Sequence, residues 1–186
     1  MGSGASNIDK YLESDIAWRF DFLYENFSIL KPMIKSYREE LILDVADMKA
    51  YNHRAQNGDL GVRVQVSVGT SRPTERQAIS NISIAKAIDE GFLDETFFEG
   101  TDDRQELIRR VKLYHRVYKD YESFQLKLDT LRKTDQEFLK PYLMREKSLA
   151  DLADELGITY RSAISKLYRI RKQLNELTTP RLMKGV

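Results

Sequence analysis

Apolar residues recur every three or four positions over most of the chain, which is the spacing of amphipathic helices. The first such set is Ile8, Leu12, Ile16, Phe20, Leu23, Phe27 and Leu30. We predict that this helix stops at Lys31-Pro32, because the residue before a proline is biased away from helical geometry. A second helix should then run to Asn57-Gly58, where turn-forming residues end it. The pair most simply forms a helical hairpin or a bent rod.

The pattern changes between Leu60 and Gly69, where valine alternates with polar residues. This period is typical of a half-buried strand, so we predict one β-strand over residues 62–68. The chain offers this strand no obvious neighbour. It would therefore pair with a second copy, with a target protein or with the irregular stretch 92–98, and the alternative is an extended linker.

Two more helices are predicted before the C-terminal third. The first begins at Pro73, a residue favoured at the first helical position, and stops at Gly91. The second should be the longest in the chain and begin at Asp102 and Asp103, which follow Thr101, because acids are favoured at a helix N-terminus. Its apolar seam is Leu107, Val111, Tyr114, Tyr118, Tyr121 and Leu128. This heptad seam packs either on the N-terminal helices or against a second subunit in a homodimer. Thr134 with Glu137 has the spacing of a capping box, which predicts the start of another helix.

The C-terminal third has the pattern of a helix-turn-helix. Ser148 and Asp151 have capping-box spacing, Gly157 can end the first helix in a left-handed conformation, and Thr159 can cap the second. The predicted buried faces are Leu149, Leu152, Ala153 and Leu156 on the first helix, and Ala163, Leu167, Ile170 and Leu174 on the second. The turn between the helices is therefore very short, as in proteins that place a helix in the major groove.

Basic side chains occupy the outward positions of the second helix. Between Ile158 and Asn175 there are five basic residues and no acid: Arg161, Lys166, Arg169, Arg171 and Lys172. Charge of one sign on such a helix is the pattern of a phosphate-binding surface. We expect groove reading by Tyr160, Arg161, Ser165 and Lys166, and phosphate contacts by Arg169, Arg171 and Lys172. The alternative is a helix whose basic face is simply solvated.

The run from Leu156 to Leu174 resembles the DNA-reading end of bacterial sigma factors, the region-four domain that recognises the −35 promoter element. Upstream residues that resemble the preceding helix of those domains are Leu128, Leu131, Phe138, Leu139 and Tyr142. The resemblance implies that the residues meeting the bases are Tyr160, Arg161, Ile164 and Ser165. Ile164 departs from the family, where the position is usually polar or basic. Its side chain either touches a thymine methyl group or is covered by protein.

A wider resemblance covers roughly the last two-thirds of the chain. The order of Pro73-Thr74-Glu75, a helix, a long helix and a sigma-like motif is similar to small phage late-gene regulators of the ArpU and RinA type. It implies activation of packaging, structural and lysis genes of phages or prophages of Gram-positive bacteria. The expected partners are promoter DNA and host RNA polymerase, in the bacterial cytoplasm at the nucleoid.

Charge and composition narrow the function further. Of 186 residues, 32% are charged, but the net charge is only +1, so a surface for DNA must be local. The chain lacks cysteine, a signal peptide and a long apolar run, from which we expect a reducing cytosol and no membrane. His53 and His115 are isolated, and no glycine loop has the lysine of a phosphate-binding loop. We therefore expect no enzyme activity, no metal and no cofactor.

These observations predict a mainly α-helical chain. Residues 1–6 look like an artificial extension, residues 7–100 like a helical assembly region with one strand, and residues 101–186 like a long helix followed by the helix-turn-helix. The leading function is sequence-specific binding of double-stranded DNA in transcription activation. One alternative is the small subunit of a terminase, which gathers DNA as a ring. Another is a protein that uses the motif to bind host RNA polymerase.

Overall fold

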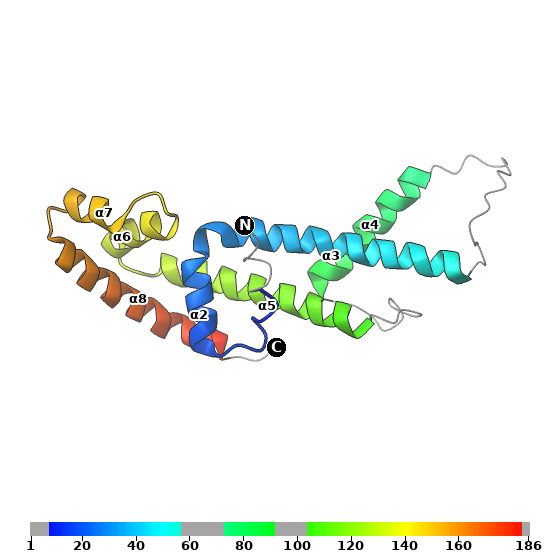
Figure 1. Ribbon diagram of the computed structural model, residues 1–186, viewed down its shortest axis with the longest axis horizontal. Coiled ribbons are helices and arrows are strands. Elements are labelled where there is room, and N and C mark those ends of the chain that lie inside the picture. Colours follow the sequence, from blue (N-terminus) through cyan, green and yellow to red (C-terminus); the bar gives the residue numbers. More distant parts are fainter. Residues whose placement is uncertain (1–7, 57–72, 92–103, 184–186) are drawn as a thin grey trace. The chain divides into compact units, whose positions relative to one another are not determined.

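The computed structural model describes residues 8–56, 73–91 and 104–183, and within them the chain is helical without a strand (Figure 1). The helices are α2 (Ile16–Glu25), α3 (Phe27–Gln56), α4 (Pro73–Glu90), α5 (Arg104–Asp129), α6 (Lys133–Leu143), α7 (Leu149–Glu155) and α8 (Tyr160–Leu182). The mainly α class is therefore confirmed. The predicted strand at residues 62–68 lies outside the described residues.

Contacts group the chain into two units, which are described separately. The motif unit consists of residues 1–34 and 116–186, and the middle unit consists of residues 35–115. Helices α3 and α5 each contribute residues to both units. This grouping does not coincide with the predicted division at residue 100, because the first helices belong with the helix-turn-helix.

The first predicted helix is divided in the structure. The side chain of Asp15 caps α2 by accepting a hydrogen bond from the backbone N–H of Trp18 at 2.7 Å. At the other end, the Asn26 backbone leaves helical geometry, and its side-chain amide donates to the Phe22 carbonyl at 2.8 Å. Asparagine competes for backbone groups in this way more readily than most residues, which explains the break here.

Proline does not interrupt the next helix, so the predicted stop at Lys31-Pro32 is wrong. Helix α3 runs through Pro32 for 30 residues, which also makes it longer than the 26-residue α5. Leu30 and Ile34 are buried on either side of the proline, whereas Pro32 itself is exposed. Burial of the apolar face thus maintains the helix although one backbone hydrogen bond is missing.

An aromatic cluster forms the core of the motif unit. The ring of Phe124 on α5 lies 6.0 Å from Phe20 of α2 and 5.6 Å from Phe27 of α3, centre to centre. Tyr121 adds a further ring 5.9 Å from Phe27. These separations are typical of packed aromatic pairs. The cluster therefore joins the N-terminal helices to the helix that leads into the motif.

The apolar seam of α5 differs from its prediction at one position. Five of its six predicted members are buried: Leu107, Val111, Tyr114, Tyr121 and Leu128. Tyr118 is instead 39% exposed, and its hydroxyl donates to Glu122 at 2.5 Å. Val117 and Phe124, both with no exposed surface, take the inner positions. The helical period allows either set, and the hydroxyl group of Tyr118 favours the side that faces water.

The start of α6 was also predicted incorrectly. Arg132 stands at the N-cap and makes no side-chain capping bond, so Thr134 lies within the first turn and no Thr134–Glu137 capping box forms. Gln136 binds the preceding turn instead, donating to the carbonyls of Asp129 at 2.7 Å and Leu131 at 2.8 Å. This contact ties α6 back to the end of α5.

Ion pairs cross the helices of the middle unit. Arg38 of α3 donates two hydrogen bonds to Asp89 of α4, both at 2.6 Å, and this guanidinium lowers the pKa of the Asp89 carboxyl. Arg110 of α5 meets Asp44 of α3 at 2.6 Å. Helix α4 begins at Pro73 and stops at Gly91 with φ +70°, as predicted.

A buried charged network joins three parts of the motif unit. Arg116 of α5 donates to Asp120 at 2.7 Å and to the carbonyl of Leu182, at the end of α8, at 2.6 Å. The hydroxyl of Tyr11 donates to the same carboxylate at 3.2 Å, and Arg181 lies 3.4 Å from its other oxygen. Burial raises the pKa of the Asp120 carboxyl, against the opposing effect of Arg116. The network connects the N-terminal segment, α5 and the end of α8.

Arg116→Ala should therefore lower the free energy of unfolding of the motif unit by about 3–5 kcal/mol, because it leaves a buried carboxylate without its main partner. Urea unfolding followed by the fluorescence of Trp18, the one tryptophan, measures this unit. Lys140→Ala is the matched control, since its 2.6 Å pair with Asp129 is solvent-exposed and should contribute no more than about 1 kcal/mol. Equal losses for the two variants would contradict the importance of the network.

Candidate DNA-binding site

Helix α7 begins with the predicted capping box. The Ser148 hydroxyl accepts from the backbone N–H of Asp151 at 3.2 Å, and the Asp151 carboxylate accepts from the backbone N–H of Ser148 at 2.8 Å. The Asp151 carboxyl also accepts from the Ser148 hydroxyl, and these hydrogen bonds lower its pKa. Ser148 and Asp151, which make these reciprocal hydrogen bonds, lie within one turn, so the local sequence is enough to predict the capping box.

The turn after α7 is also as predicted. Gly157 has φ +62°, and the backbone N–H of Ile158 donates back to the Ala153 carbonyl at 3.0 Å. The hydroxyl of Thr159 then caps α8 by accepting from the backbone N–H of Ser162 at 3.2 Å. Only two residues, Ile158 and Thr159, separate the glycine from the first residue of α8.

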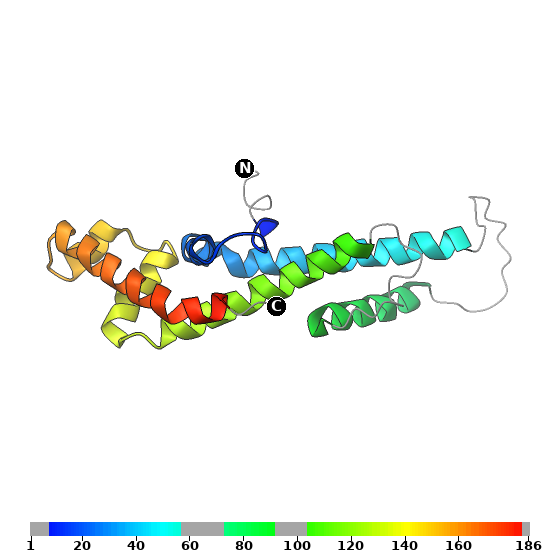
Figure 2. The ribbon, with the colours of Figure 1, turned by 90° about the horizontal axis from the view of Figure 1, so that it is seen from below.

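The inner face of α8 fixes its rotation about its own axis. Ala163, Ile170 and Leu174 have no exposed surface, and α8 packs on α7, α6 and α2 (Figure 1, Figure 2). Leu167, also predicted in this face, is partly buried. On α7, Leu152 and Ala153 are buried and Leu149 is partly so. Leu156, the C-cap residue at the end of α7, is 48% exposed, so its predicted place in the core is wrong.

The opposite face of α8 carries the predicted groove-reading residues Arg161 and Ser165, the predicted phosphate contact Lys172, and Tyr168, which was not predicted. Arg161, Ser165, Tyr168 and Lys172 are all exposed and follow one another at intervals of four, three and four residues. This spacing places them on one side of the helix. Among the described residues, Arg161 and Lys172 have no ion-pair partner, so their charges are available to a ligand.

Two other basic residues of α8 contact α6. The Lys166 ammonium group lies 4.8 Å from the centre of the Phe138 ring. Arg169 lies 3.4 Å from the buried Asp135, but its side chain is 69% exposed. A pair at this distance and exposure constrains the guanidinium weakly, so Arg169 can still reach a phosphate.

Arg171 is placed differently from its neighbours. Its guanidinium donates to Asp21 of α2 at 2.7 Å and lies 5.0 Å from the centre of the Tyr24 ring. The hydrogen bond to Asp21 raises the pKa of Arg171. It points about 100° around the helix from Lys172. Arg171 thus binds α2 in the structure, whereas the sequence pattern had grouped it with the phosphate contacts.

A hollow of about 620 Å³ lies at the N-terminal end of α8. Its lining residues are Ile158, Thr159, Arg161, Ser162, Ser165, Lys166 and Arg169. Three basic side chains and three hydroxyl groups therefore converge beside a helix N-terminus, where the helix dipole also favours an anion. The charge of the hollow suits an anion.

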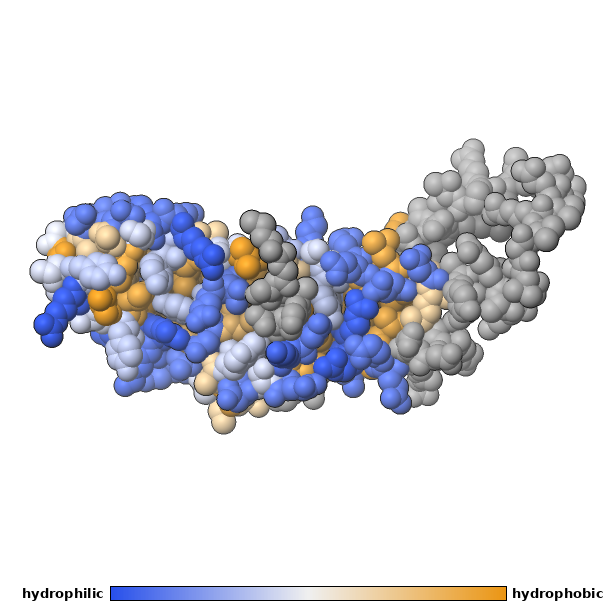
Figure 3. Space-filling model, viewed as in Figure 1, coloured by the Kyte–Doolittle hydropathy of each residue, from blue (hydrophilic) through white to orange (hydrophobic). Residues whose placement is uncertain are grey.

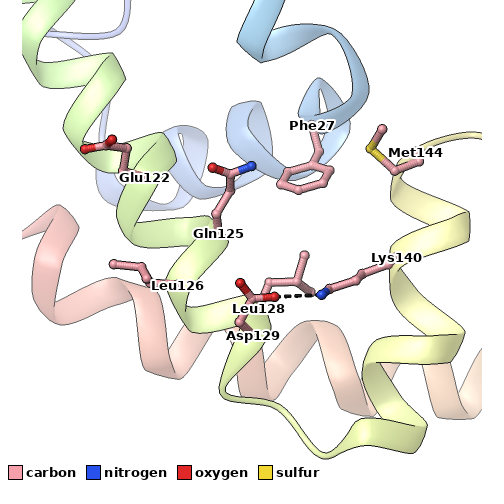
Figure 4. Close-up of a pocket in the computed structure, with 8 residues that line it drawn as sticks. All are labelled: Phe27, Glu122, Gln125, Leu126, Leu128, Asp129, Lys140 and Met144. Carbon is pink, nitrogen blue, oxygen red and sulfur yellow. Dashed lines mark ion pairs between the residues drawn. The ribbon is translucent and has the colours of Figure 1, made fainter.

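A second hollow, of about 550 Å³, lies between α3, α5 and α6 (Figure 4). Figure 4 shows Phe27 and Met144 near each other at one side and the Lys140–Asp129 ion pair at the other. Its remaining acid, Glu122, accepts from the Tyr118 hydroxyl. Its charged groups thus all contact other protein side chains.

The sequence interpretation missed two residues of this region. Tyr168 is 71% exposed on the outer face of α8, and its four-residue spacing from Ile164 was the available signal. Asp21 lies 150 residues before its partner Arg171, and nothing in the local sequence indicates this contact.

In comparisons with known proteins, no family model, curated protein or solved structure matches the chain. Within residues 8–56, 73–91 and 104–183, no helix is long and apolar enough to cross a membrane. The same part of the chain contains no cluster of three or more side chains able to hold a metal ion.

Gly157→Ala should lower the free energy of unfolding of the motif unit by about 1–2 kcal/mol, because an L-residue is strained at φ +62°. A Cβ atom there would meet nothing within 4 Å, so the loss comes from backbone conformation alone. Gly157→Asn is the control, since asparagine tolerates this conformation better. Urea unfolding of both variants checks this, and a larger loss for asparagine would contradict the conformational explanation.

Proposed function

We propose that this protein is a sequence-specific, double-stranded DNA-binding transcription regulator that inserts the N-terminal half of α8 into the major groove. The observation that carries the proposal is the outward face of α8, where Arg161, Ser165 and Lys172 are exposed opposite a fully buried stripe. A major groove about 12 Å wide admits one helix, and the first residues of the second helix read bases in this class of protein.

Electrostatics supports the same orientation. Residues 158–175 contain no acid. The acids that approach this part of α8 from other helices, Asp135 and Asp21, pair with Arg169 and Arg171. Arg161 and Lys172 are left without an ion-pair partner among the described residues. Arg161, Lys166 and Arg169 surround the hollow beside the N-terminus of α8, which suits a phosphate of the DNA backbone. Lys172, two turns beyond Ser165, would meet a second phosphate on the same face.

The proposed biological role rests on the resemblance of the run from Leu156 to Leu174 to the sigma-factor domain. Within this run, Gly157 has φ +62° and Thr159 caps α8. The role is activation of phage or prophage late genes, with promoter DNA and host RNA polymerase as partners in the bacterial cytoplasm. Selection of bound duplexes from a random pool, followed by mass measurement in solution, tests it. A ring of eight or more chains would instead favour a terminase small subunit.

Arg161→Ala should weaken binding to the selected duplex by about 1–3 kcal/mol and binding to random duplex by less, because arginine in the first turn reads base edges. Lys172→Ala should weaken both alike, because a phosphate contact carries no sequence information. Competition binding at one fixed salt concentration measures, for each variant, the ratio of its affinities for the selected and the random duplex.

Arg171→Ala is the control for this experiment, since its guanidinium already binds Asp21. It should affect the unfolding of the motif unit more than the discrimination between the two duplexes. If Arg161→Ala reduced both affinities equally, the assignment of Arg161 to base reading would be refuted.

A further inference from the structure

Exposed apolar and aromatic side chains follow a second row along α8. Tyr160, Ile164 and Tyr168 are 56%, 46% and 71% exposed, respectively. They are four residues apart, so they are neighbours on the helix surface. The row borders the basic face that contains Arg161 and Lys172. Figure 3 shows apolar patches among hydrophilic residues over the part of the surface formed by α7 and α8.

The fold does not need this row. The core positions of α8 are Ala163, Ile170 and Leu174 on the other side of the helix, all without exposed surface. The sequence left two alternatives for Ile164, contact with a thymine methyl group or cover by the protein itself. The protein does not cover it, since the residue is 46% exposed. An exposed isoleucine between two exposed tyrosines on a basic helix therefore suits an external partner that offers both apolar and negatively charged groups.

The surrounding charge determines which partner fits. The row lies beside Arg161 and Lys172, within a stretch of sequence that contains no acid, and Asp21, the acid that shares a hollow with Tyr168, is paired with Arg171. An apolar protein surface would have to carry acids at matching positions. Duplex DNA offers phosphates at the sides of the groove and one apolar group on its floor, the 5-methyl group of thymine.

We propose that Ile164, flanked by Tyr160 and Tyr168, selects thymine by contacting its 5-methyl group in the major groove. This inference rests on the proposed function and specifies its substrate as a site with thymine at a fixed position. Isoleucine can neither donate nor accept a hydrogen bond. At that position it therefore favours the base that presents a methyl group over cytosine, whose exposed amino group would lose its partner.

The experiment removes the methyl group alone. A duplex is first selected from a random pool by the full-length chain, and each thymine in it is then replaced, one at a time, by deoxyuridine. Deoxyuridine keeps every hydrogen-bonding group of thymine and lacks only the 5-methyl group. For the wild-type chain we expect about fourfold weaker binding at one or two positions, the value of burying one methyl-sized group, and no change elsewhere.

Variants assign the effect to Ile164. Ile164→Ala should bind the thymine and deoxyuridine duplexes equally at the sensitive position, and Ile164→Val should retain part of the difference. Leu126→Ala is the matched control, because Leu126 is also an exposed apolar residue, at 66%, but lies on α5. It should retain the full wild-type difference. Circular dichroism of each variant checks that the helices are intact.

Three results would overturn the inference. The selected site could lack thymine, the wild-type affinity could be unchanged by deoxyuridine at every position, or Ile164→Ala could show the same loss of affinity with deoxyuridine as the wild-type chain. Failure of the proposed function is distinguishable from these. In that case, no duplex is enriched from the pool, and none binds the wild-type chain, with or without thymine methyl groups.

Discussion

Burial of one face of α8 is the constraint on which the rest of the site depends. Ala163, Ile170 and Leu174 are completely covered, and rotating the helix would expose them at a cost of several kcal/mol. The two-residue connection after Gly157 and the cap at Thr159 fix where the helix starts. With its rotation and its first residue both determined, the helix must present Arg161, Ser165 and Lys172 outward. The candidate interface is thus a consequence of core packing.

The N-terminal helices are part of this constraint. Helix α2 packs on α8 and holds Arg171 through Asp21, while Phe20 and Phe27 pack on Phe124. The network around Asp120 connects the end of α8 to the same assembly. The helix-turn-helix therefore lacks much of its supporting core without residues 8–34. The last turns of α8 thus pack against the rest of the motif unit, whereas its first turns are exposed to a ligand.

Features determined within one or two turns could be predicted from the sequence. The Ser148–Asp151 box, the Gly157 turn, the Thr159 cap and the exposed basic face of α8 are of this kind. The wrong predictions concern competition between local signals and packing. Pro32 lies in a helix whose buried face continues past the proline. On α5, Val117 is buried where Tyr118 was predicted, and Tyr118 is exposed.

Long-range contacts explain what the sequence could not predict about the site. Arg171 looked equivalent to Lys172 in a basic run, and only the approach of Asp21 from a distant segment distinguishes them. The exposure of Ile164 could not be decided for the same reason, because it depends on which helices cover α8. A single sequence shows the periodicity of a helix but not which neighbour covers each side.

The central claim is that duplex DNA binds the basic face of α8 through its phosphates, and the salt dependence of affinity measures this most directly. Each phosphate neutralised contributes about −0.9 to the slope of log affinity against log salt concentration. If Lys166, Arg169 and Lys172 neutralise phosphates while Arg161 reads bases, the slope for each bound chain should be about −2 to −3. A slope near zero, or no binding to duplex DNA at low salt, would contradict the account.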